Sequence, residues 1–195
     1  MSAAGKTCRA IKLRSPATKI MMTGTHPAAL PRRTMEDEEI DFVCDSEGPQ
    51  TIRQVVTALK DKWTTWHPIP HLWYRNGDYI LQNKGGELLK DLDTAMPGGA
   101  WDLLPMDKYR AHNWHCFEHI DQREPYVSIH TSLGCPFRCN FCCINAPFGK
   151  SSYRMWSPAT VGREIDLLTT RYGIRNIKFV DEMFVLNPEH VIGVC

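Results

Sequence analysis

Three cysteines on one short segment, Cys135, Cys139 and Cys142, constrain this chain more than any other feature. Their Cys-x3-Cys-x2-Cys spacing puts three thiolates on one loop, one ligand short of a closed tetrahedral metal site. Three thiolates can hold three irons of a 4Fe–4S cluster and leave the fourth iron open to a further ligand. The loop therefore predicts a metal site that can carry out chemistry rather than only store electrons.

Other uses of cysteine fit this loop less well. Zinc sites usually combine two Cys-x2-Cys pairs, and no second pair lies near the triad. Bacterial ferredoxins use a Cys-x2-Cys-x2-Cys spacing with a fourth cysteine before a proline. A disulfide framework is not expected in a chain of 195 residues, which is long enough to build a core. Two alternatives stay open: Cys143 gives a rival spacing with Cys139, and the triad could form a closed four-ligand site with Cys143 or Cys116.

The cysteine loop lies inside a predicted βαβ unit. The alternating, β-branched run 126–131 predicts a strand, and 157–173 predicts a helix that starts with Ser-Pro and ends at Gly. The apolar run 176–180 predicts a second strand, parallel to the first and joined to it by a right-handed crossover. Parallel α/β barrels carry their chemistry at the carboxyl ends of the strands, so the loop and Asp181-Glu182 should share one rim.

Phe141, the aromatic residue before the last cysteine, makes the loop resemble that of the radical S-adenosylmethionine (SAM) enzymes. The segment 179–184, Phe-Val-Asp-Glu-Met-Phe, is similar to a motif of those radical SAM enzymes that also carry a cobalamin domain. The resemblance implies a 4Fe–4S cluster on the triad, with Cys142 rather than Cys143 as the third ligand, and SAM on the open iron. It also implies that Phe141 lies near the adenine of SAM and that Asp181, ahead of Glu182, meets its polar end.

The first part of the chain resembles the second half of a cobalamin-binding domain. Two turns carry the resemblance, Thr-Gly-Thr-His-Pro at 23–27 and Ser-Glu-Gly-Pro at 46–49. It implies that Thr23, Gly24 and Gly48 lie near the nucleotide tail of cobalamin, where small residues let the backbone approach. A lone histidine in a turn is not expected to be a metal ligand, which applies to His26. The predicted elements here are helices at 8–13, 32–38 and 49–59 and strands at 19–22 and 41–44.

A connector follows. Residues 72–81 predict a β-hairpin, because Asn76-Gly77 suits a type I′ turn, and the aromatic residues of 97–109 are expected to pack between domains. Both stretches are similar to cobalamin-type radical SAM proteins, so the resemblance covers nearly the whole chain. We therefore predict an α/β fold: the second half of a Rossmann-like cobalamin-binding domain at 1–62, a hairpin-containing connector at 63–122, and the first βα units of a radical SAM partial (β/α) barrel at 123–195.

The composition of the chain limits the kinds of partner that it is expected to bind. The formal net charge of +1 gives no reason to expect a nucleic-acid partner, and no apolar run is long enough for a membrane span. Eight cysteines, clustered rather than paired, indicate a reducing compartment, and we expect a cytoplasmic protein.

The resemblance predicts a fragment, truncated at both ends, of an enzyme that cleaves SAM reductively to a 5′-deoxyadenosyl radical. The implied reactions are cobalamin-dependent methyl transfer and ring or carbon-skeleton modification, as in anaerobic magnesium-protoporphyrin ester cyclases and hopanoid-modifying proteins. The implied partners are a small-molecule, lipid or tetrapyrrole-like substrate and an electron donor such as flavodoxin or ferredoxin. The fragment is expected to be inactive alone, and to bind cobalamin only with the rest of the domain. The alternative is a non-catalytic zinc or iron–sulfur module with a closed four-cysteine site.

Overall fold

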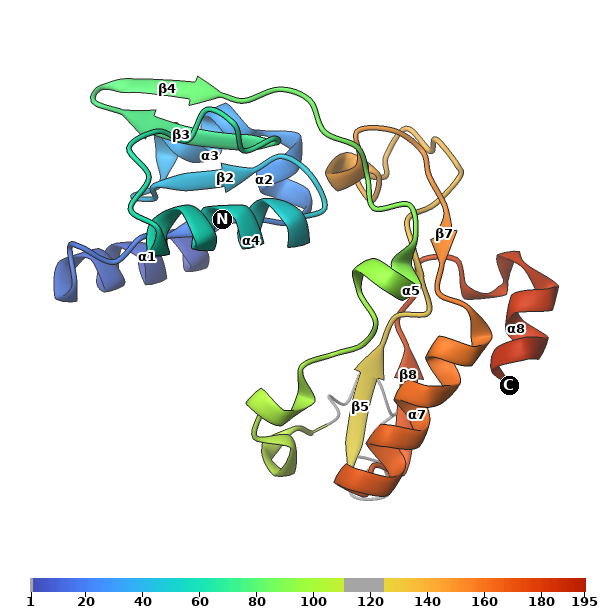
Figure 1. Cartoon of the computed structure of the whole chain (residues 1–195). Coiled ribbons are helices and arrows are strands. Elements are labelled where there is room, and N and C mark those ends of the chain that lie inside the picture. The colour runs from blue at the N-terminus through green and yellow to red at the C-terminus, as the bar shows by residue number, and fades with distance from the viewer. Residues whose placement is uncertain (1, 111–124) are drawn as a thin grey trace. The chain divides into compact units, whose positions relative to one another are not determined.

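The computed structural model describes residues 2–110 and 125–195, which form two compact units (Figure 1). Unit 1 contains the described residues of Met1–Leu88 together with Phe137–Ser151. Unit 2 contains those of Leu89–Pro136 together with Ser152–Cys195. The domain boundaries that the sequence predicts, after residues 62 and 122, are not tested by this division into units and remain predictions.

Unit 1 is built on a four-stranded sheet in the order β1-β2-β3-β4. Strand β1 (Met21–Met22) pairs in parallel with β2 (Phe42–Cys44), and the hairpin of β3 (Leu72–Asn76) and β4 (Tyr79–Gln82) adds to β2 antiparallel. The predicted hairpin is therefore present, and it extends the sheet of unit 1.

The hairpin turn differs from the predicted type I′ turn. Because Asn76 pairs with Tyr79, the two turn residues are Gly77 and Asp78. Only Gly77 has a positive φ, of 58°. A type I′ turn needs positive φ at both central residues, whereas a type II′ turn needs it only at the first, which is where the glycine stands.

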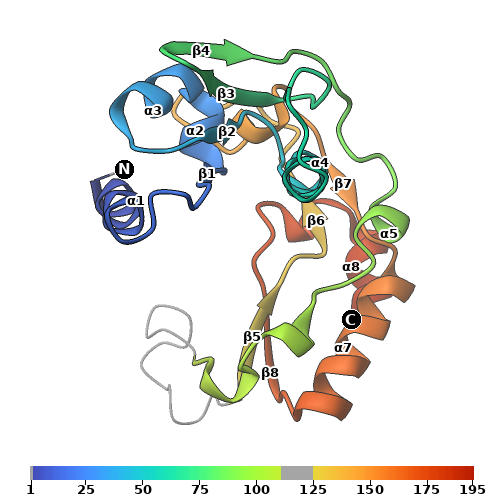
Figure 2. The same ribbon diagram turned by 60° about the vertical axis from the view of Figure 1, so that its left-hand side comes forward.

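Helices cover both faces of this sheet, because side chains alternate between the faces along each strand. Figure 2 views α4 nearly end-on, on the opposite side of the sheet from α1 and α3. The core beneath α1 and α3 contains Cys8, Met22, Met35, Ile40, Val43 and Trp73, and the core beneath α4 contains Phe42, Val55, Ala58, Ile69, Leu72 and Tyr74. The helices are α1 (Ser2–Arg14), α2 (Thr25–Ala29), α3 (Pro31–Asp37) and α4 (Pro49–Lys60).

Unit 2 contains the predicted βαβ unit. Strands β5 (Tyr126–Ile129) and β8 (Asn176–Phe179) are parallel and are joined through helix α7 (Pro158–Tyr172). The helix begins where its sequence predicts, because the Ser157 hydroxyl accepts the N–H of Thr160, and it ends at Gly173 with a φ of 63°.

Shorter elements complete the chain. In unit 2 they are helix α5 (Leu92–Ala95), the 3-10 turns η1 (Trp101–Leu103), η2 (Met106–Lys108) and η4 (Phe184–Leu186), the strands β6 (Ser132–Leu133) and β7 (Arg154–Met155), and helix α8 (Pro188–Val194). The 3-10 turn η3 (Ala146–Phe148) belongs to unit 1 and packs against α2.

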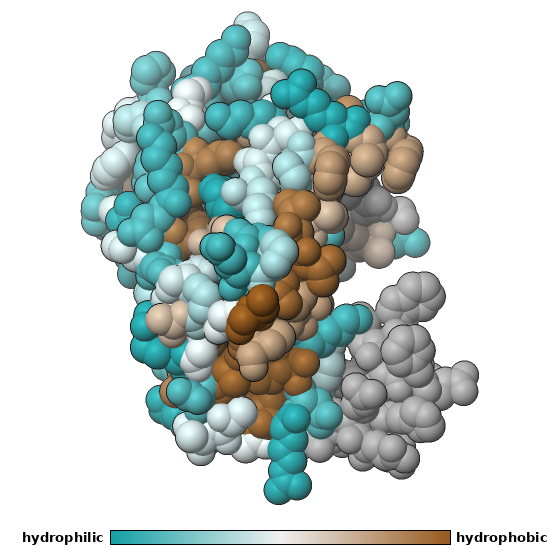
Figure 3. Space-filling model, turned by 90° about the vertical axis from the view of Figure 1, so that its right-hand side faces the viewer, coloured by the Kyte–Doolittle hydropathy of each residue, from teal (hydrophilic) through white to brown (hydrophobic). Residues whose placement is uncertain are grey.

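The core of unit 2 lies between α7 and one face of the β5–β8 sheet. It contains Leu89, Leu92, Met106, Val127, Ile129, Trp156, Val161, Leu168 and Ile174. Apolar side chains also remain at the surface where α8 comes forward (Figure 3), and Val185 and Ile192 are 75% and 78% exposed. Within the described residues, every helix is too short or too polar to cross a membrane.

Candidate functional site

The cysteine loop is closed at its base by a short stem. Strand β6 pairs antiparallel with β7, so that Ser132 faces Met155 and Leu133 faces Arg154. The N–H of Trp156 donates to the carbonyl of Thr131 at 3.0 Å and extends this pairing by one bond. The stem follows β5 directly, so the loop leaves the carboxyl end of the first parallel strand, as the sequence predicted.

The cysteines of the loop are accessible thiols. Cys139, Cys142 and Cys143 are exposed, Cys135 is half-buried, and all four are free. The N–H of Cys142 donates to the carbonyl of Cys139 at 3.0 Å, which folds the second half of the triad into a tight turn. Over the part of the chain that the structure describes, no three His, Cys, Asp or Glu side chains are gathered as a metal site. The donor set, four free thiols that are exposed or half-buried, suits a thiolate-bound cluster.

Two other cysteines have a different environment. Cys8 and Cys44 are buried in unit 1, and burial raises the pKa of both thiols. A raised pKa keeps a thiol protonated, whereas metal ligation needs the thiolate. These two residues are therefore core side chains, and the described cysteines available to a metal lie on the loop and at the exposed Cys195. Cys116, a candidate fourth ligand, lies outside the described residues.

Phe141 lies within the Cys139–Cys142 turn, and its side chain is 92% exposed. Its ring therefore adds almost nothing to the core of this chain. Such a ring is available to pack on a flat apolar ligand, which is the role that its position in the motif predicts.

The two acidic residues after β8, Asp181 and Glu182, have different environments. Asp181 Oδ1 accepts the N–H and the hydroxyl of Thr131, at 2.8 Å and 3.0 Å. It also accepts the N–H and the hydroxyl of Ser132, the latter at 2.7 Å. Its second oxygen, Oδ2, is buried and has no hydrogen-bond partner within the described chain. Glu182, in contrast, is exposed to solvent.

A buried histidine contacts Thr131, one of the hydrogen-bond partners of Asp181. His190 of α8 is 4% exposed, and its Nε2 lies 2.8 Å from the hydroxyl oxygen of Thr131. Thr131 and His190 were not among the site residues predicted from the sequence. The signal that could have suggested Thr131 is a Thr-Ser pair after one parallel strand and an Asp after its neighbour, because such ends meet at one rim.

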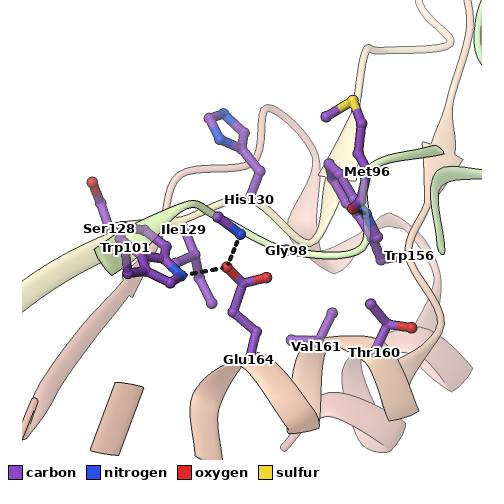
Figure 4. Close-up of a pocket in the computed structure, with 11 residues that line it drawn as sticks. Met96, Gly98, Trp101, Ser128, Ile129, His130, Trp156, Thr160, Val161 and Glu164 are labelled. Carbon is purple, nitrogen blue, oxygen red and sulfur yellow. Dashed lines mark hydrogen bonds between the residues drawn. The ribbon is translucent and has the colours of Figure 1, made fainter. Parts of the chain in front are cut away.

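Unit 2 also contains a pocket of about 240 Å³ between α7, the end of β5 and the segment 96–101 (Figure 4). Glu164 Oε1 accepts the N–H of Gly99 and the indole Nε1–H of Trp101, both at 2.8 Å. The ring of His130 points away from Glu164 in Figure 4. Trp101 is thus a packing residue within unit 2, and Glu164 holds the segment on α7; the sequence did not predict this contact.

The two glycine turns of unit 1 leave neighbouring parallel strands. Gly24 follows β1 with a φ of 106° and Gly48 follows β2 with a φ of 103°, so both positions favour glycine for conformational reasons. A Cβ at Gly24 would meet no atom within 4 Å. The predicted turn at 23–27 is shorter than expected, because helix α2 already begins at Thr25 and includes the exposed His26.

Known proteins match this chain in sequence and in structure, although no family model matches it. An uncharacterised methyltransferase of Pyrococcus horikoshii is 34% identical over 176 residues, which are 90% of this chain and 36% of that protein. An anaerobic magnesium-protoporphyrin IX monomethyl ester cyclase of Synechocystis is 24% identical over 152 residues, which are 78% of this chain and 28% of the cyclase. The chain thus spans about a third of the length of these relatives.

Solved structures share the fold. The radical SAM methyltransferase TsrM of Kitasatospora setae, solved with its tryptophan substrate and a SAM analogue, matches 99% of this chain with a TM-score of 0.71 and 18% identity. The match covers 35% of TsrM. The cobalamin-dependent radical SAM enzyme OxsB, with aqua-cobalamin and SAM bound, matches 100% of this chain with a TM-score of 0.70 and 18% identity, over 26% of its own length.

The fold is therefore the α/β fold of cobalamin-dependent radical SAM enzymes, represented in part. The sequence relatives of the chain include anaerobic magnesium-protoporphyrin IX monomethyl ester cyclases, whose reaction is among the examples that the resemblance implied. The predicted resemblance to the cobalamin-binding-domain radical SAM family and the predicted fold class are both confirmed.

Proposed function

We propose that this chain carries the cluster site of a cobalamin-dependent radical SAM enzyme, with Cys135, Cys139 and Cys142 as the thiolate ligands of a 4Fe–4S cluster. The observation that carries the proposal is the placement of three free thiols, in Cys-x3-Cys-x2-Cys spacing, on a stem-closed loop at the carboxyl end of the first strand of a βαβ unit. A TsrM structure with cobalamin and a [4Fe–4S] cluster bound has the same fold, with a TM-score of 0.66.

The residues around the loop have separate roles in this proposal. A bound cluster would supply the electron that cleaves SAM to a 5′-deoxyadenosyl radical. Phe141 is exposed within the Cys139–Cys142 turn and would pack on the adenine. Of the two acidic candidates for the polar end of SAM, Glu182 is the better one. Its side chain is exposed, whereas Asp181 uses one oxygen for four hydrogen bonds and has the other buried.

The reaction proposed for the whole enzyme is methyl transfer. A relative at 34% identity is named a methyltransferase, and TsrM is one as well. The cyclase relatives support ring modification as the second possibility, on a small-molecule, lipid or tetrapyrrole-like substrate. In this proposal Thr23, Gly24 and Gly48 line the approach to a cobalamin tail, and a flavodoxin or ferredoxin in the cytoplasm supplies the electron.

Anaerobic reconstitution with iron and sulfide tests the cluster directly. We expect about four irons and four sulfides per chain and a broad visible absorption that bleaches on reduction with dithionite. Replacing Cys135, Cys139 or Cys142 by Ala should abolish assembly, whereas Cys143→Ala, the matched control, should keep the iron content. Tightly bound zinc without sulfide would overturn the proposal in favour of the closed four-cysteine module. Iron loss in Cys143→Ala but not in Cys142→Ala would reassign the third ligand.

A further inference from the structure

A chain of hydrogen bonds runs from α8 to the base of the cysteine loop. It begins at the buried His190, passes through the hydroxyl of Thr131 and ends at the Asp181 carboxylate. The same carboxylate oxygen accepts two further bonds from Ser132, the first residue of the stem strand β6. Helix α8, the end of β8 and the stem are thereby connected through buried and partly buried polar groups.

The direction of each bond follows from the number of protons available. The Thr131 hydroxyl has one proton and lies 3.0 Å from an Asp181 oxygen, which as a carboxylate can only accept. The hydroxyl must therefore donate to Asp181 and accept at its lone pair from His190. This requires the proton of the imidazole to be on Nε2, the nitrogen 2.8 Å from Thr131. The histidine thus holds the hydroxyl in the orientation that Asp181 needs.

We propose that His190, Thr131 and Asp181 form a positioning chain that fixes the stem of the cysteine loop and thereby the place of Cys135. Only Leu133 and Gly134 separate Ser132, which is hydrogen-bonded to Asp181, from Cys135. Gly134 has a φ of 86°, so the backbone turns sharply between the stem and the first thiol. A shift of the stem would therefore redirect Cys135, although none of the three positioning residues is a ligand.

The half-buried state of Cys135 gives a test that needs no cluster. Cys139, which is exposed in the same loop, serves as an internal reference. In the metal-free 195-residue chain, iodoacetamide labelling of each cysteine can be followed by peptide mass spectrometry. Thr131→Val removes the hydroxyl but keeps its shape and its backbone N–H bond, and His190→Phe removes the ring donor. Both variants should raise the labelling rate of Cys135 about tenfold, through easier local opening, and leave that of Cys139 unchanged.

Conservative variants separate positioning from general damage. Thr131→Ser keeps the hydroxyl, and His190→Gln places an amide N–H near the position of Nε2. Both should restore the slow labelling of Cys135. If Thr131→Val labels Cys135 at the rate of the unaltered chain, with the thermal unfolding midpoint also unchanged, the positioning chain does not exist. If Thr131→Ser labels as fast as Thr131→Val, the effect is due to packing and the proposal is wrong.

A second measurement uses the reconstituted chain and rests on the proposed cluster. Loss of iron to a chelator should be about tenfold faster in Thr131→Val and His190→Phe, as for outer-shell partners of other metal sites, and near normal in Thr131→Ser. If the unaltered chain assembles no cluster, the proposed function fails, while the labelling experiment still decides the positioning chain. If labelling changes as expected but chelation does not, the chain orients Cys135 without supporting a cluster, and the link to metal retention is refuted.

Discussion

Asp41 joins helix α1 to the sheet of unit 1 by charge, and its replacement should destabilise that unit in a pH-dependent way. The carboxylate accepts the Lys12 ammonium at 2.6 Å, the Lys19 ammonium at 2.9 Å and the N–H of Ile20 at 2.9 Å. Burial alone would raise the pKa of the Asp41 carboxyl, but the hydrogen bonds from Lys12, Ile20 and Lys19 outweigh it and hold that pKa below its usual range.

The size of the effect follows from the exposure of each partner. The Lys12 and Asp41 side chains are 20% and 17% exposed, so this bond belongs with partly buried charged hydrogen bonds, which contribute about 1.5–3 kcal/mol. Lys19 is 48% exposed, and such a pair contributes about 0–1 kcal/mol. Asp41→Asn keeps the shape and removes the charge, so we expect it to lower the free energy of unfolding by about 2–3 kcal/mol near pH 7.

The sign of the pH dependence is fixed by the lowered pKa. A carboxyl whose folded pKa lies below its unfolded value stabilises the fold above the unfolded value, about 3.9, and loses that effect as the pH falls through the folded pKa. Urea unfolding followed by circular dichroism between pH 7 and pH 3 should therefore show a constant gap between Asp41→Asn and the unaltered chain down to about pH 5, and a narrowing gap below about pH 4.

A gap that stays the same over the whole pH range would refute the reasoning, because the residue would then act through packing. Asp37→Asn is the matched control. Asp37 pairs with Arg33 one helical turn away, but the two side chains are 61% and 72% exposed. We expect this control to change the unfolding free energy by no more than about 0.5 kcal/mol.

Three further perturbations test other parts of the fold by urea unfolding. Gly24→Ala should destabilise unit 1 by about 1–3 kcal/mol through backbone strain alone, because φ is 106° and ψ is −172° while the new Cβ meets nothing. The control Gly162→Ala, inside α7, should be neutral or stabilising. Equal effects of the two substitutions would exclude strain at Gly24. Glu164→Ala should release the segment of Gly99 and Trp101, lower stability by about 1–3 kcal/mol and shift tryptophan fluorescence to the red, and an unshifted spectrum would contradict the contact. Leu168→Ala, at a fully buried position of α7, should cost about 2–5 kcal/mol, and a loss below 1 kcal/mol would show that the core of unit 2 is looser than described.

The elements predicted best are those whose signals are local and agree with one another. For α7 the capping Ser157, the proline after it, the helical spacing of apolar residues and Gly173 all indicate the same bounds. The parallel pairing of β5 and β8 followed from that helix, because a strand–helix–strand order permits little else. The turn at 23–27 is shorter than the resemblance implied, because Pro27 fits the first turn of helix α2, where the N–H that proline lacks would have no partner.

The contacts that the sequence did not predict join residues far apart in the chain. Asp181 meets Thr131 fifty positions away, and Glu164 meets Trp101 across sixty-three. The sequence around Asp181 and around Glu164 does not identify these partners, because each partner lies on a distant element. The cysteine triad could be recognised because its spacing is local, whereas the contacts at the base of the loop depend on how two strand ends meet.

The stem that closes the cysteine loop has a consequence for tolerance to insertions. The pairing of β6 with β7 fixes where the loop begins and ends. Extra residues between the exposed Gly149 and Lys150 would therefore lengthen the loop without moving its two ends. Doubling the length of such a path costs only about 0.6 kcal/mol of closure entropy, little compared with the bonds that hold the stem. This part of the chain is therefore where length variation among homologues, or an inserted reporter peptide, should be accepted with the stem left intact.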